Sequence, residues 1–230
     1  MSGYFYLVST PIGNFKDITL RALEILTSVN FIICEEYKEA KRLLSYYKID
    51  KELVALNEHN EKESSEEILP RLLNGESAAL ISDCGTPLFS DPGHYLLGLC
   101  LGKNIKVIPV PGVNSLLPAI TASGLHVEKF YYYGWLSPKK EERRKQLFKL
   151  KTINEVIVIL DTPYRLKTLL SDVQRIFGSN LKIVLAFEIT KDKEKFYRGP
   201  IAEIIYLVEK QSLKGEFVLS LDNRNSSHNY

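Results

Sequence analysis

The fold is decided by one segment, Ala78-Ala79-Leu80-Ile81-Ser82-Asp83-Cys84-Gly85-Thr86-Pro87-Leu88-Phe89-Ser90-Asp91-Pro92-Gly93. Its first four residues are small or apolar and predict the end of a buried strand. Two glycines, two prolines and two aspartates then predict a loop, and the apolar pattern of 94–101 predicts a helix. Open α/β sheets bind their ligands at such loops, where a buried strand ends. The segment therefore predicts either a ligand-binding loop or a rigid turn capped by its aspartates.

Strand, loop and helix alternate through the first half of the chain. Apolar runs predict strands at residues 4–8, 31–34, 53–56, 78–81 and 105–110. Between them we expect a helix capped by Asp17, a helix at 41–47, one capped by Ser64 and ended at Gly75, and one at 94–101. This alternation predicts an N-terminal α/β domain, residues 1–111, with a mostly parallel, doubly wound sheet.

The second half has more strand and a different order of elements. We expect helices at 115–123, 138–151 and 166–177, and strands at 130–135, 156–160, 182–187 and 216–221. Residues 112–230 are therefore predicted to form a C-terminal mixed α/β domain. The polar residues 223–230 are predicted to be a disordered tail.

Composition excludes several classes of protein. Among 230 residues the net charge is only +2, and the hydrophobic fraction is 45%, so we expect an ordinary globular protein. The three cysteines, Cys34, Cys84 and Cys100, suit neither a disulfide framework nor a zinc site, which indicates a reducing cytosol and no metal. Apolar runs are too short for a signal peptide or a membrane span, so we expect a cytoplasmic protein without membrane contact.

Polar residues gather where the predicted parallel strands end. The loops at 10–14, 35–38, 57–61 and 83–93 should line one edge of the sheet and form a common cleft. His59 could act as a general base or only as a hydrogen-bonded structural residue. Glu35, Glu36 and Lys38 could orient a substrate hydroxyl or form a solvated ion-pair cluster.

Known phosphate-loop, dinucleotide, nucleophile-elbow and zincin motifs are missing from the sequence. A cleft of this kind suits a reaction that depends on orientation, such as methyl transfer from a sulfonium donor.

A basic run follows an aromatic strand. Seven Lys and Arg residues stand against two Glu between residues 138 and 151, and Tyr131, Tyr133 and Trp135 precede them. Basic charge beside aromatic rings suits RNA phosphates and bases. The same pattern also suits a solvated helix face next to a sheet core, and the residues alone leave both readings open.

Several motifs along nearly the whole chain resemble one family. The sequence is similar to the ribosomal RNA small-subunit methyltransferase I family in its opening, 6–14 with 17–23, and in seven later segments: 58–61, 82–88, 90–93, 109–112, 122–125, 188–191 and 215–218. These segments stand in the order in which the family has them. The resemblance implies a tetrapyrrole-methylase fold, in which two α/β domains form the donor cleft between them, and a homodimer.

The same resemblance implies S-adenosylmethionine as the methyl donor and a cytidine ribose 2′-hydroxyl of small-subunit (16S) ribosomal RNA as the target. Carried over by position, the residues that bind the donor are Pro11, Asp83, Gly85, Thr86, Pro87, Leu88, Ser115, Ala122, Ser123 and Gly134. Glu35, Glu58 and His59 are the candidates to accept the proton. The candidates to bind RNA are Lys38, Lys139, Lys140, Arg143, Arg144 and Lys145.

Three segments depart from the family pattern. Lys38 stands where the family usually has arginine, which loses a planar bidentate phosphate contact. Val113-Asn114 follows Pro111-Gly112 in place of Pro-Ser, and Asp161-Thr162-Pro163-Tyr164-Arg165 replaces Glu-Ser-Pro-His-Arg. The departures fall more on the substrate side than on the donor loop. Two alternatives therefore stay open: a methylase of a tetrapyrrole precursor, and a ribosome-binding relative without activity.

Overall fold

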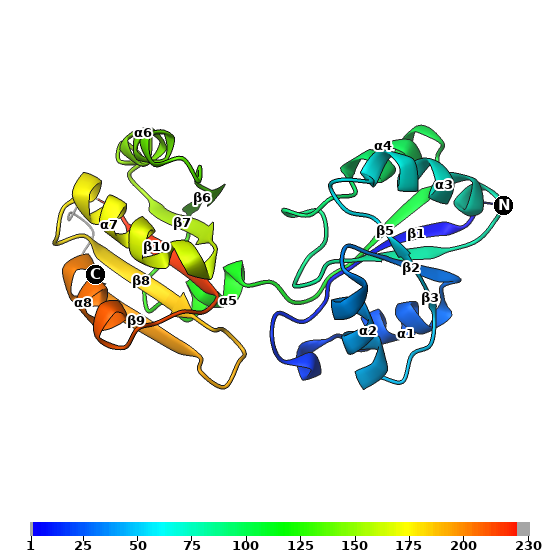
Figure 1. Ribbon diagram of the computed structural model, residues 1–230, viewed down its shortest axis with the longest axis horizontal. Coiled ribbons are helices and arrows are strands. Elements are labelled where there is room, and N and C mark those ends of the chain that lie inside the picture. Colours follow the sequence, from blue (N-terminus) through cyan, green and yellow to red (C-terminus); the bar gives the residue numbers. More distant parts are fainter. Residues whose placement is uncertain (1, 225–230) are drawn as a thin grey trace. The chain divides into compact units, whose positions relative to one another are not determined.

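The computed structural model describes residues 2–224, which divide into two compact units (Figure 1). Unit 1 extends to Asn114 and unit 2 begins at Ser115. Each unit has its own five-stranded sheet. Among the residues described, no helix is long and apolar enough to cross a membrane.

Unit 1 is a three-layer α/β structure. Its strands are β1 (Tyr4–Val8), β2 (Phe31–Cys34), β3 (Glu52–Ala55), β4 (Ala78–Ile81) and β5 (Lys106–Val110). They pair in the order β3-β2-β4-β1-β5, and every pair is parallel. The helices are α1 (Leu20–Ser28), α2 (Tyr37–Tyr46), α3 (Glu61–Leu73) and α4 (His94–Gly102), with a 3₁₀ turn η1 (Phe15–Asp17) before α1. The predicted doubly wound parallel sheet is confirmed.

Burial on both faces of this sheet explains its apolar strands. One cluster packs Phe5, Ile33 and Leu80 against α3 and α4, and the other packs Val8, Ile32 and α1 with α2 (Figure 1). Successive strand residues point to opposite faces, so a strand covered on both sides reads as a continuous apolar run. This arrangement leaves the carboxyl edge of the sheet as the place where polar loops collect.

The starts of α1, α2 and α3 differ from the prediction: α2 begins at Tyr37, before the expected residue 41, and other residues make the caps of α1 and α3. Thr19, not Asp17, caps α1, since its hydroxyl oxygen accepts from the N–H of Ala22 at 3.1 Å. Ser64 lies inside α3, which begins at Glu61 after Asn60. The Glu61 carboxylate accepts the N–H groups of Gly93 (2.7 Å) and Tyr95 (2.9 Å). Glu61 on α3 thus fixes the start of α4. The sequence near a helix start does not reveal such a contact between two helices.

Unit 2 has a mixed sheet. Its strands are β6 (Phe130–Trp135), β7 (Val156–Asp161), β8 (Lys182–Phe187), β9 (Lys195–Pro200) and β10 (Phe217–Asp222), in the order β6-β7-β10-β8-β9. Only β6 and β7 are parallel. The helices are α5 (Leu116–Thr121), α6 (Lys140–Leu150), α7 (Leu166–Phe177) and α8 (Ile201–Lys210), with a 3₁₀ turn η2 (Pro163–Arg165) before α7.

Two elements of unit 2 were not predicted, β9 and α8. The strand carries Lys195 and Arg198 and ends in Gly199-Pro200, a pair that usually indicates a turn. It forms because its pairing with β8 buries Tyr197. Helix α8 then adds Ile201, Ile204 and Val208 to the core, together with α6 and α7.

The predicted disordered tail begins inside the ordered structure. The Asn223 side-chain amide donates to the carbonyls of Lys151 (3.1 Å) and Ile153 (2.6 Å), and the Arg224 guanidinium donates to the carbonyl of His126. These two residues are therefore anchored. The rest of that prediction, 225–230, lies outside the described residues.

Candidate functional site

Three loops of unit 1 are joined at the carboxyl edge of its sheet. The loops after β1 and β4 exchange backbone hydrogen bonds, because the Thr10 N–H donates to the Gly85 carbonyl (2.8 Å) and the Gly85 N–H donates to the Thr10 carbonyl (3.2 Å). The buried Thr10 hydroxyl donates to the Ser82 carbonyl at 2.8 Å. Because β1 and β4 are adjacent and parallel, their loops leave the sheet side by side and can be tied in this way.

Thr86 connects this pair of loops to the third one. Its hydroxyl lies 3.1 Å from the Ser9 hydroxyl and donates to the Val113 carbonyl, in the loop after β5, at 3.3 Å. Gly112 lies so close to Ser9 that an added Cβ would come within 2.9 Å of the Ser9 Cβ. We call residues 9–14, 82–93 and 111–114 the three-loop edge. Pro11, Asp83, Gly85 and Thr86, predicted from separate segments, meet there.

The loop after β4 has an unusual backbone. Gly85 and Gly93 have φ values of +93° and +121°, and Leu88 has φ of +66°. A leucine rarely adopts that conformation, and strained residues of this kind concentrate at functional sites. A Cβ at Gly93 would lie 2.9 Å from methyl groups of both Leu80 and Leu88. Packing therefore holds the loop in one shape before any ligand binds.

Three carboxyl groups lie on one side of this edge, those of Glu35, Asp83 and Asp91. Burial raises the pKa of Glu35, and the negative charges of Asp83 and Asp91 raise it further. Burial also raises the pKa of Asp83, opposed by the hydrogen bond that its carboxylate accepts from the Glu36 N–H at 3.2 Å. Burial raises the pKa of Asp91 as well, opposed by a hydrogen bond with Ser82. These carboxyl groups favour a positively charged ligand, which would relieve their repulsion.

Sequence reasoning did not select Asp91 or Ser9 as site residues. Asp91 lies in the predicted loop, but its nearness to Glu35 depends on the order of the strands. Ser9 directly follows β1, and only the pairing of β1 with β4 brings it to Thr86. The signal for Ser9 was its position directly after a buried strand, and the signal for Asp91 was its place in the loop that follows β4.

The other two predicted proton acceptors stand in solvent. The side chains of Glu58 and His59 are 80% and 88% exposed, and the His59 Nε2 lies 3.9 Å from a Glu58 carboxylate oxygen. Glu58 acts on Glu35 only through its charge. Of the three candidates, Glu35 alone is half-buried, and its pKa is raised.

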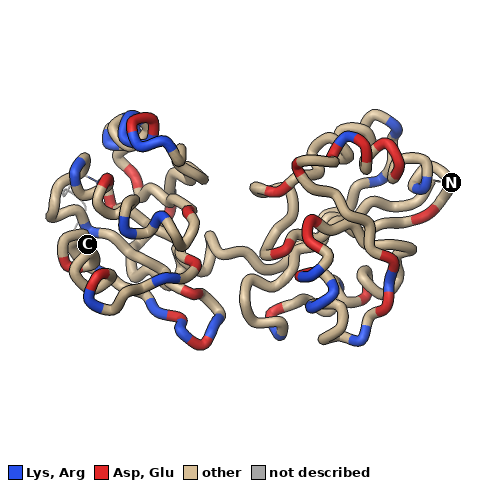
Figure 2. The backbone as a smooth tube through the Cα atoms, in the orientation of Figure 1, with Lys and Arg blue, Asp and Glu red and all other residues tan. Residues whose placement is uncertain are grey.

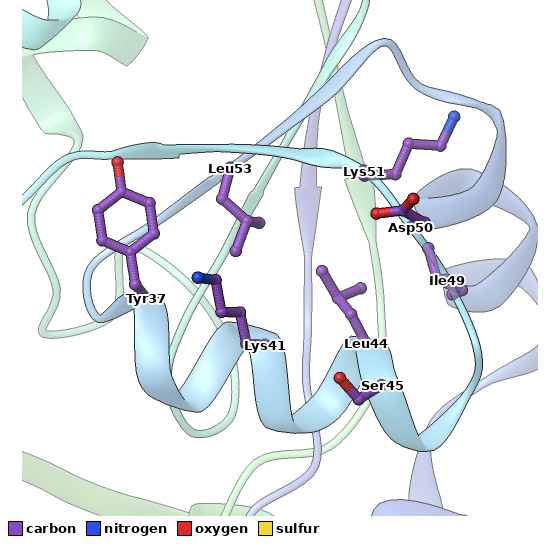
Figure 3. Close-up of a pocket in the computed structure, with 8 residues that line it drawn as sticks. All are labelled: Tyr37, Lys41, Leu44, Ser45, Ile49, Asp50, Lys51 and Leu53. Atoms are coloured by element: carbon purple, nitrogen blue, oxygen red, sulfur yellow. The ribbon is translucent and has the colours of Figure 1, made fainter.

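A separate hollow of about 500 Å³ lies between α2 and β3 (Figure 3). Its lining is mixed: Tyr37, Lys41, Leu44, Ser45, Ile49, Asp50, Lys51 and Leu53. The Tyr37 hydroxyl accepts from the Ala55 N–H at 3.2 Å. None of the predicted site residues lines it. Among the residues described, no group of three His, Cys, Asp or Glu side chains could hold a metal ion.

Four predicted donor residues belong to unit 2. Ser115 is the N-cap of α5, and the Ala122 and Ser123 carbonyls beyond its end accept from the Arg198 guanidinium, at 2.5 and 2.7 Å. Gly134 has φ of +83° at an irregularity between β6 and β7. Arg198 thus fixes the turn after α5, and donor binding by these four residues stays a prediction.

The predicted RNA-binding residues on α6 separate into two groups. Lys139, Lys140 and Lys145 are exposed, and Figure 2 marks in blue the Lys and Arg positions along this helix. Arg143 is buried, and its guanidinium contacts the Asp172 carboxylate at 2.7 Å; Arg144 contacts the other oxygen of Asp172 at 2.7 Å. The charge of Arg143 joins α6 to α7, and RNA binding by these predicted residues stays a prediction.

Comparison with known proteins gives a consistent result. The family model "Tetrapyrrole (Corrin/Porphyrin) Methylases" matches residues 4–205. "Ribosomal RNA small subunit methyltransferase I" of Bacillus subtilis is 39% identical over 224 residues, which cover 97% of this chain and 76% of that protein. The protein of the same name from Thermotoga maritima is 40% identical over 222 residues, which cover 96% and 99%.

Solved structures share the fold at low sequence identity. A cobalt precorrin-4 methyltransferase has a TM-score of 0.72 at 15% identity, covering 95% of this chain and 94% of that one. Uroporphyrin-III C-methyl transferase from Thermus thermophilus, crystallised with S-adenosyl homocysteine, has a TM-score of 0.67 at 18% identity, covering 95% and 97%. The two-domain α/β fold is therefore shared with these methyltransferases.

Proposed function

Because the chain belongs to the ribosomal RNA small subunit methyltransferase I family, within the tetrapyrrole methylases, we propose that it methylates small-subunit ribosomal RNA with S-adenosylmethionine as donor. The proposed target is the 2′-hydroxyl of a cytidine ribose. The observation that carries the proposal is the three-loop edge, in which Thr86 connects the loops after β1, β4 and β5.

The residues of this edge fit the chemistry of the donor. S-adenosylmethionine supplies an electrophilic methyl group on a positively charged sulfonium, and the carboxyl groups of Glu35, Asp83 and Asp91 provide a complementary negative field. The prearranged backbone of residues 83–88 offers N–H and carbonyl groups for neutral parts of a ligand. Pro11 and residues 83–88 would hold the donor in unit 1, and Ser115, Ala122, Ser123 and Gly134 would do so in unit 2.

Glu35 is the group we assign to accept the proton. A ribose hydroxyl becomes a better nucleophile when a base takes its proton as the new bond forms. A carboxylate with a raised pKa is a stronger base than one in water. Glu35 has that property, because burial and four neighbouring carboxylates disfavour its charge. Glu58 and His59, both exposed, have no comparable environment.

The exposed lysines would bind the RNA backbone. Lys139, Lys140 and Lys145 are placed to neutralise phosphates without breaking an internal ion pair. Lys38, exposed near the start of α2, extends the same role in unit 1. Arg143 and Arg144 are omitted from this surface. We expect the protein to act as a homodimer in the cytoplasm on the small ribosomal subunit, and sedimentation would measure the dimer.

Titration calorimetry with S-adenosylmethionine tests donor binding first. A Thr86→Arg variant puts a long cation where the three loops meet, so we expect affinity to fall at least about tenfold. Thr27→Arg is the matched control, because Thr27 is an exposed threonine on α1. Absence of binding by the wild-type protein, with and without RNA, would sink the enzyme proposal and favour a ribosome-binding relative.

Transfer of a radioactive methyl group to small subunits tests the substrate. A ribose 2′-O-methyl group blocks alkaline cleavage of the adjacent phosphodiester bond, so the labelled RNA should resist hydrolysis at one cytidine. Label on a base would contradict the 2′-O assignment. Label on a tetrapyrrole precursor with none on RNA would support the alternative methylase.

A further inference from the structure

One exposed aromatic residue of unit 2 has no part in the proposal so far. The Tyr164 ring is 80% exposed, and the Lys214 ammonium lies 4.6 Å from its centroid. Large apolar rings at this level of exposure are normal when they stand alone. Here the ring is paired with a cation from a segment fifty residues away in sequence, so the two side chains form a defined surface feature.

The sheet of unit 2 brings these residues together. Strands β7 and β10 are antiparallel, and Asp161 at the end of β7 is opposite Phe217 at the start of β10. Tyr164 is three residues after Asp161, and Lys214 is three residues before Phe217. The two flanking loops therefore leave the sheet at the same edge and on adjacent strands.

The segment that carries Tyr164 is fixed by contacts with the buried Asp161 carboxylate. Arg165 contacts the buried Asp161 carboxylate at 2.5 Å, and Asp161 also accepts the Thr162 N–H at 2.6 Å. Pro163 begins the turn and fixes one backbone dihedral. Because the turn is fixed, the ring of Tyr164 is presented to solvent without the entropic cost of ordering a mobile loop.

The same turn connects to the basic helix. The Arg165 guanidinium donates to the Leu136 carbonyl at 3.1 Å, in the segment after β6. Arg143 and Gln146 of α6 hold the next residue, Ser137, through its carbonyl and its N–H. Lys139 and Lys140 follow directly. The Tyr164–Lys214 pair therefore stands at the end of a connected path from the exposed lysines of α6.

We propose that Tyr164 and Lys214 bind one unpaired nucleotide of the RNA substrate. The base would stack on the exposed face of the Tyr164 ring, and the Lys214 ammonium would contact the adjacent phosphate. Stacking on an aromatic ring beside a cation is how proteins bind single-stranded RNA without reading its sequence. The proposal rests on the proposed function, because it takes the partner to be RNA.

Charge favours RNA over a protein surface as the occupant. The Lys214 ammonium lies 4.6 Å from the ring centroid, and Lys139 and Lys140 are exposed in the same unit, while the Asp161 carboxylate, three residues before Tyr164, is buried and paired with Arg165. A protein partner would need an acidic patch to match them, whereas every nucleotide of RNA carries a phosphate beside a flat base.

Fluorescence anisotropy with a labelled single-stranded RNA of about 12 nucleotides tests whether the Tyr164–Lys214 pair binds RNA. We expect Tyr164→Ala to weaken binding about tenfold, and Tyr164→Phe to bind as the wild type does, because phenylalanine keeps the stacking face. An RNA of the same length without bases should bind Tyr164→Ala and wild type equally. Lys214→Ala should lower the slope of log affinity against log salt concentration by about 1.

Tyr206→Ala is the matched control. Tyr206 on α8 is also exposed (60%), and Lys210 lies 5.7 Å from its ring, so it repeats the pair at another place in unit 2. We expect this variant to keep full RNA affinity.

Several outcomes would overturn the inference. Wild-type RNA affinity in Tyr164→Ala would do so, as would an equal loss in Tyr164→Phe or Tyr206→Ala. A change in sedimentation without a change in RNA affinity would show that Tyr164 contacts protein instead. Titration with S-adenosylmethionine and methyl transfer separate the two proposals. If the wild type binds RNA through Tyr164 but transfers no methyl group, the proposed reaction fails and this inference stands.

Discussion

At the scale of single residues, the site depends on one half-buried carboxyl group, that of Glu35. Glu35 directly follows β2 at the edge of the sheet and is partly buried. Burial and the charges of Asp83 and Asp91 raise its pKa. The energy that this environment costs the folded protein is what makes Glu35 a stronger base.

Replacing Glu35 tests whether its environment lowers the stability of the folded protein. A raised pKa means that the folded state binds the proton more tightly than the unfolded state. Wild-type stability therefore falls as pH rises from the ordinary value of 4.5 through the higher folded-state pKa. Glu35→Gln removes this loss, so at neutral pH we expect a melting temperature higher by about 2 °C, with no difference below pH about 4.

Activity should change in the opposite direction. Glutamine cannot accept the proton, so we expect the methyl-transfer rate of Glu35→Gln at saturating S-adenosylmethionine to fall about a hundredfold. Its affinity for the positively charged donor should fall as well, because one carboxyl group of the negative field is lost. Glu58→Gln, at an exposed carboxylate, is the control and should alter neither property. An active Glu35→Gln enzyme would rule out Glu35 as the proton acceptor.

At the scale of elements, the positively charged residues of helix α6 have two roles. Some form ion pairs with α7, and the exposed ones are proposed to bind RNA. These cations look alike in the sequence, and only the partner on α7 distinguishes them. Asp172 is buried and takes Arg143 and Arg144, one on each oxygen. A pattern in one helix cannot contain a contact with the next helix, so the sequence did not show that Arg143 and Arg144 pair with Asp172.

Asp172→Asn should release α6 from α7. It leaves the buried Arg143 without its counter-charge, which costs about 3–5 kcal/mol of the free energy of unfolding. Burial alone would raise the pKa of Asp172, but the hydrogen bonds from Arg144 and Arg143 lower it overall. Its stabilisation is thus complete above the ordinary value of 3.8 and lost as pH falls through the folded-state pKa.

Urea unfolding at several pH values measures this effect. The difference between Asp172→Asn and wild type should shrink toward strong acid, where the wild-type carboxyl is also protonated. Asp192→Asn, at an exposed aspartate of the same unit, is the control and should match the wild type throughout. Equal stability of Asp172→Asn and wild type at neutral pH would contradict this account of α6.

Other elements were predictable to different degrees. Strands such as β4 could be located from the sequence, because a strand that is buried on both faces is a continuous run of apolar residues. Helix starts were less accurate, since Thr19 and Asp17 are both good caps and the fold uses one. β9 was missed because its Gly199-Pro200 end indicates a turn, whereas the strand forms through the pairing with β8 that buries Tyr197.

At the scale of the whole molecule, stability is divided between two cores. Leu80 belongs to a cluster of unit 1, and Leu219 belongs to the cluster of unit 2. Separate cores allow each unit to open by itself. The loops that meet around Thr86 were predictable because all parallel strands end at one edge. The nearness of Asp91 to Glu35 was not, since it follows from strand order.

Hydrogen exchange measured by mass spectrometry tests the division. Leu80→Ala and Leu219→Ala each remove a buried side chain and should cost about 2–5 kcal/mol. We expect the first to speed amide exchange in β1, β2 and β4, and the second to speed exchange in β7, β8 and β10. Uniform acceleration across the chain by either variant would show that the two units unfold as one.

One of the three cysteines gives this protein a natural site for chemical labelling. Cys84 is exposed in the loop after β4, next to Gly85 and Thr86, whereas Cys34 and Cys100 are buried. Burial, with Asp83 and Glu36, raises the pKa of Cys34 to about 12, and burial raises that of Cys100 to about 11. Alkylating reagents require the thiolate, so they will modify the chain at Cys84 first. The labelling rate then reports, in the unaltered protein, whether this loop is covered, and oxidants will reach the same sulfur.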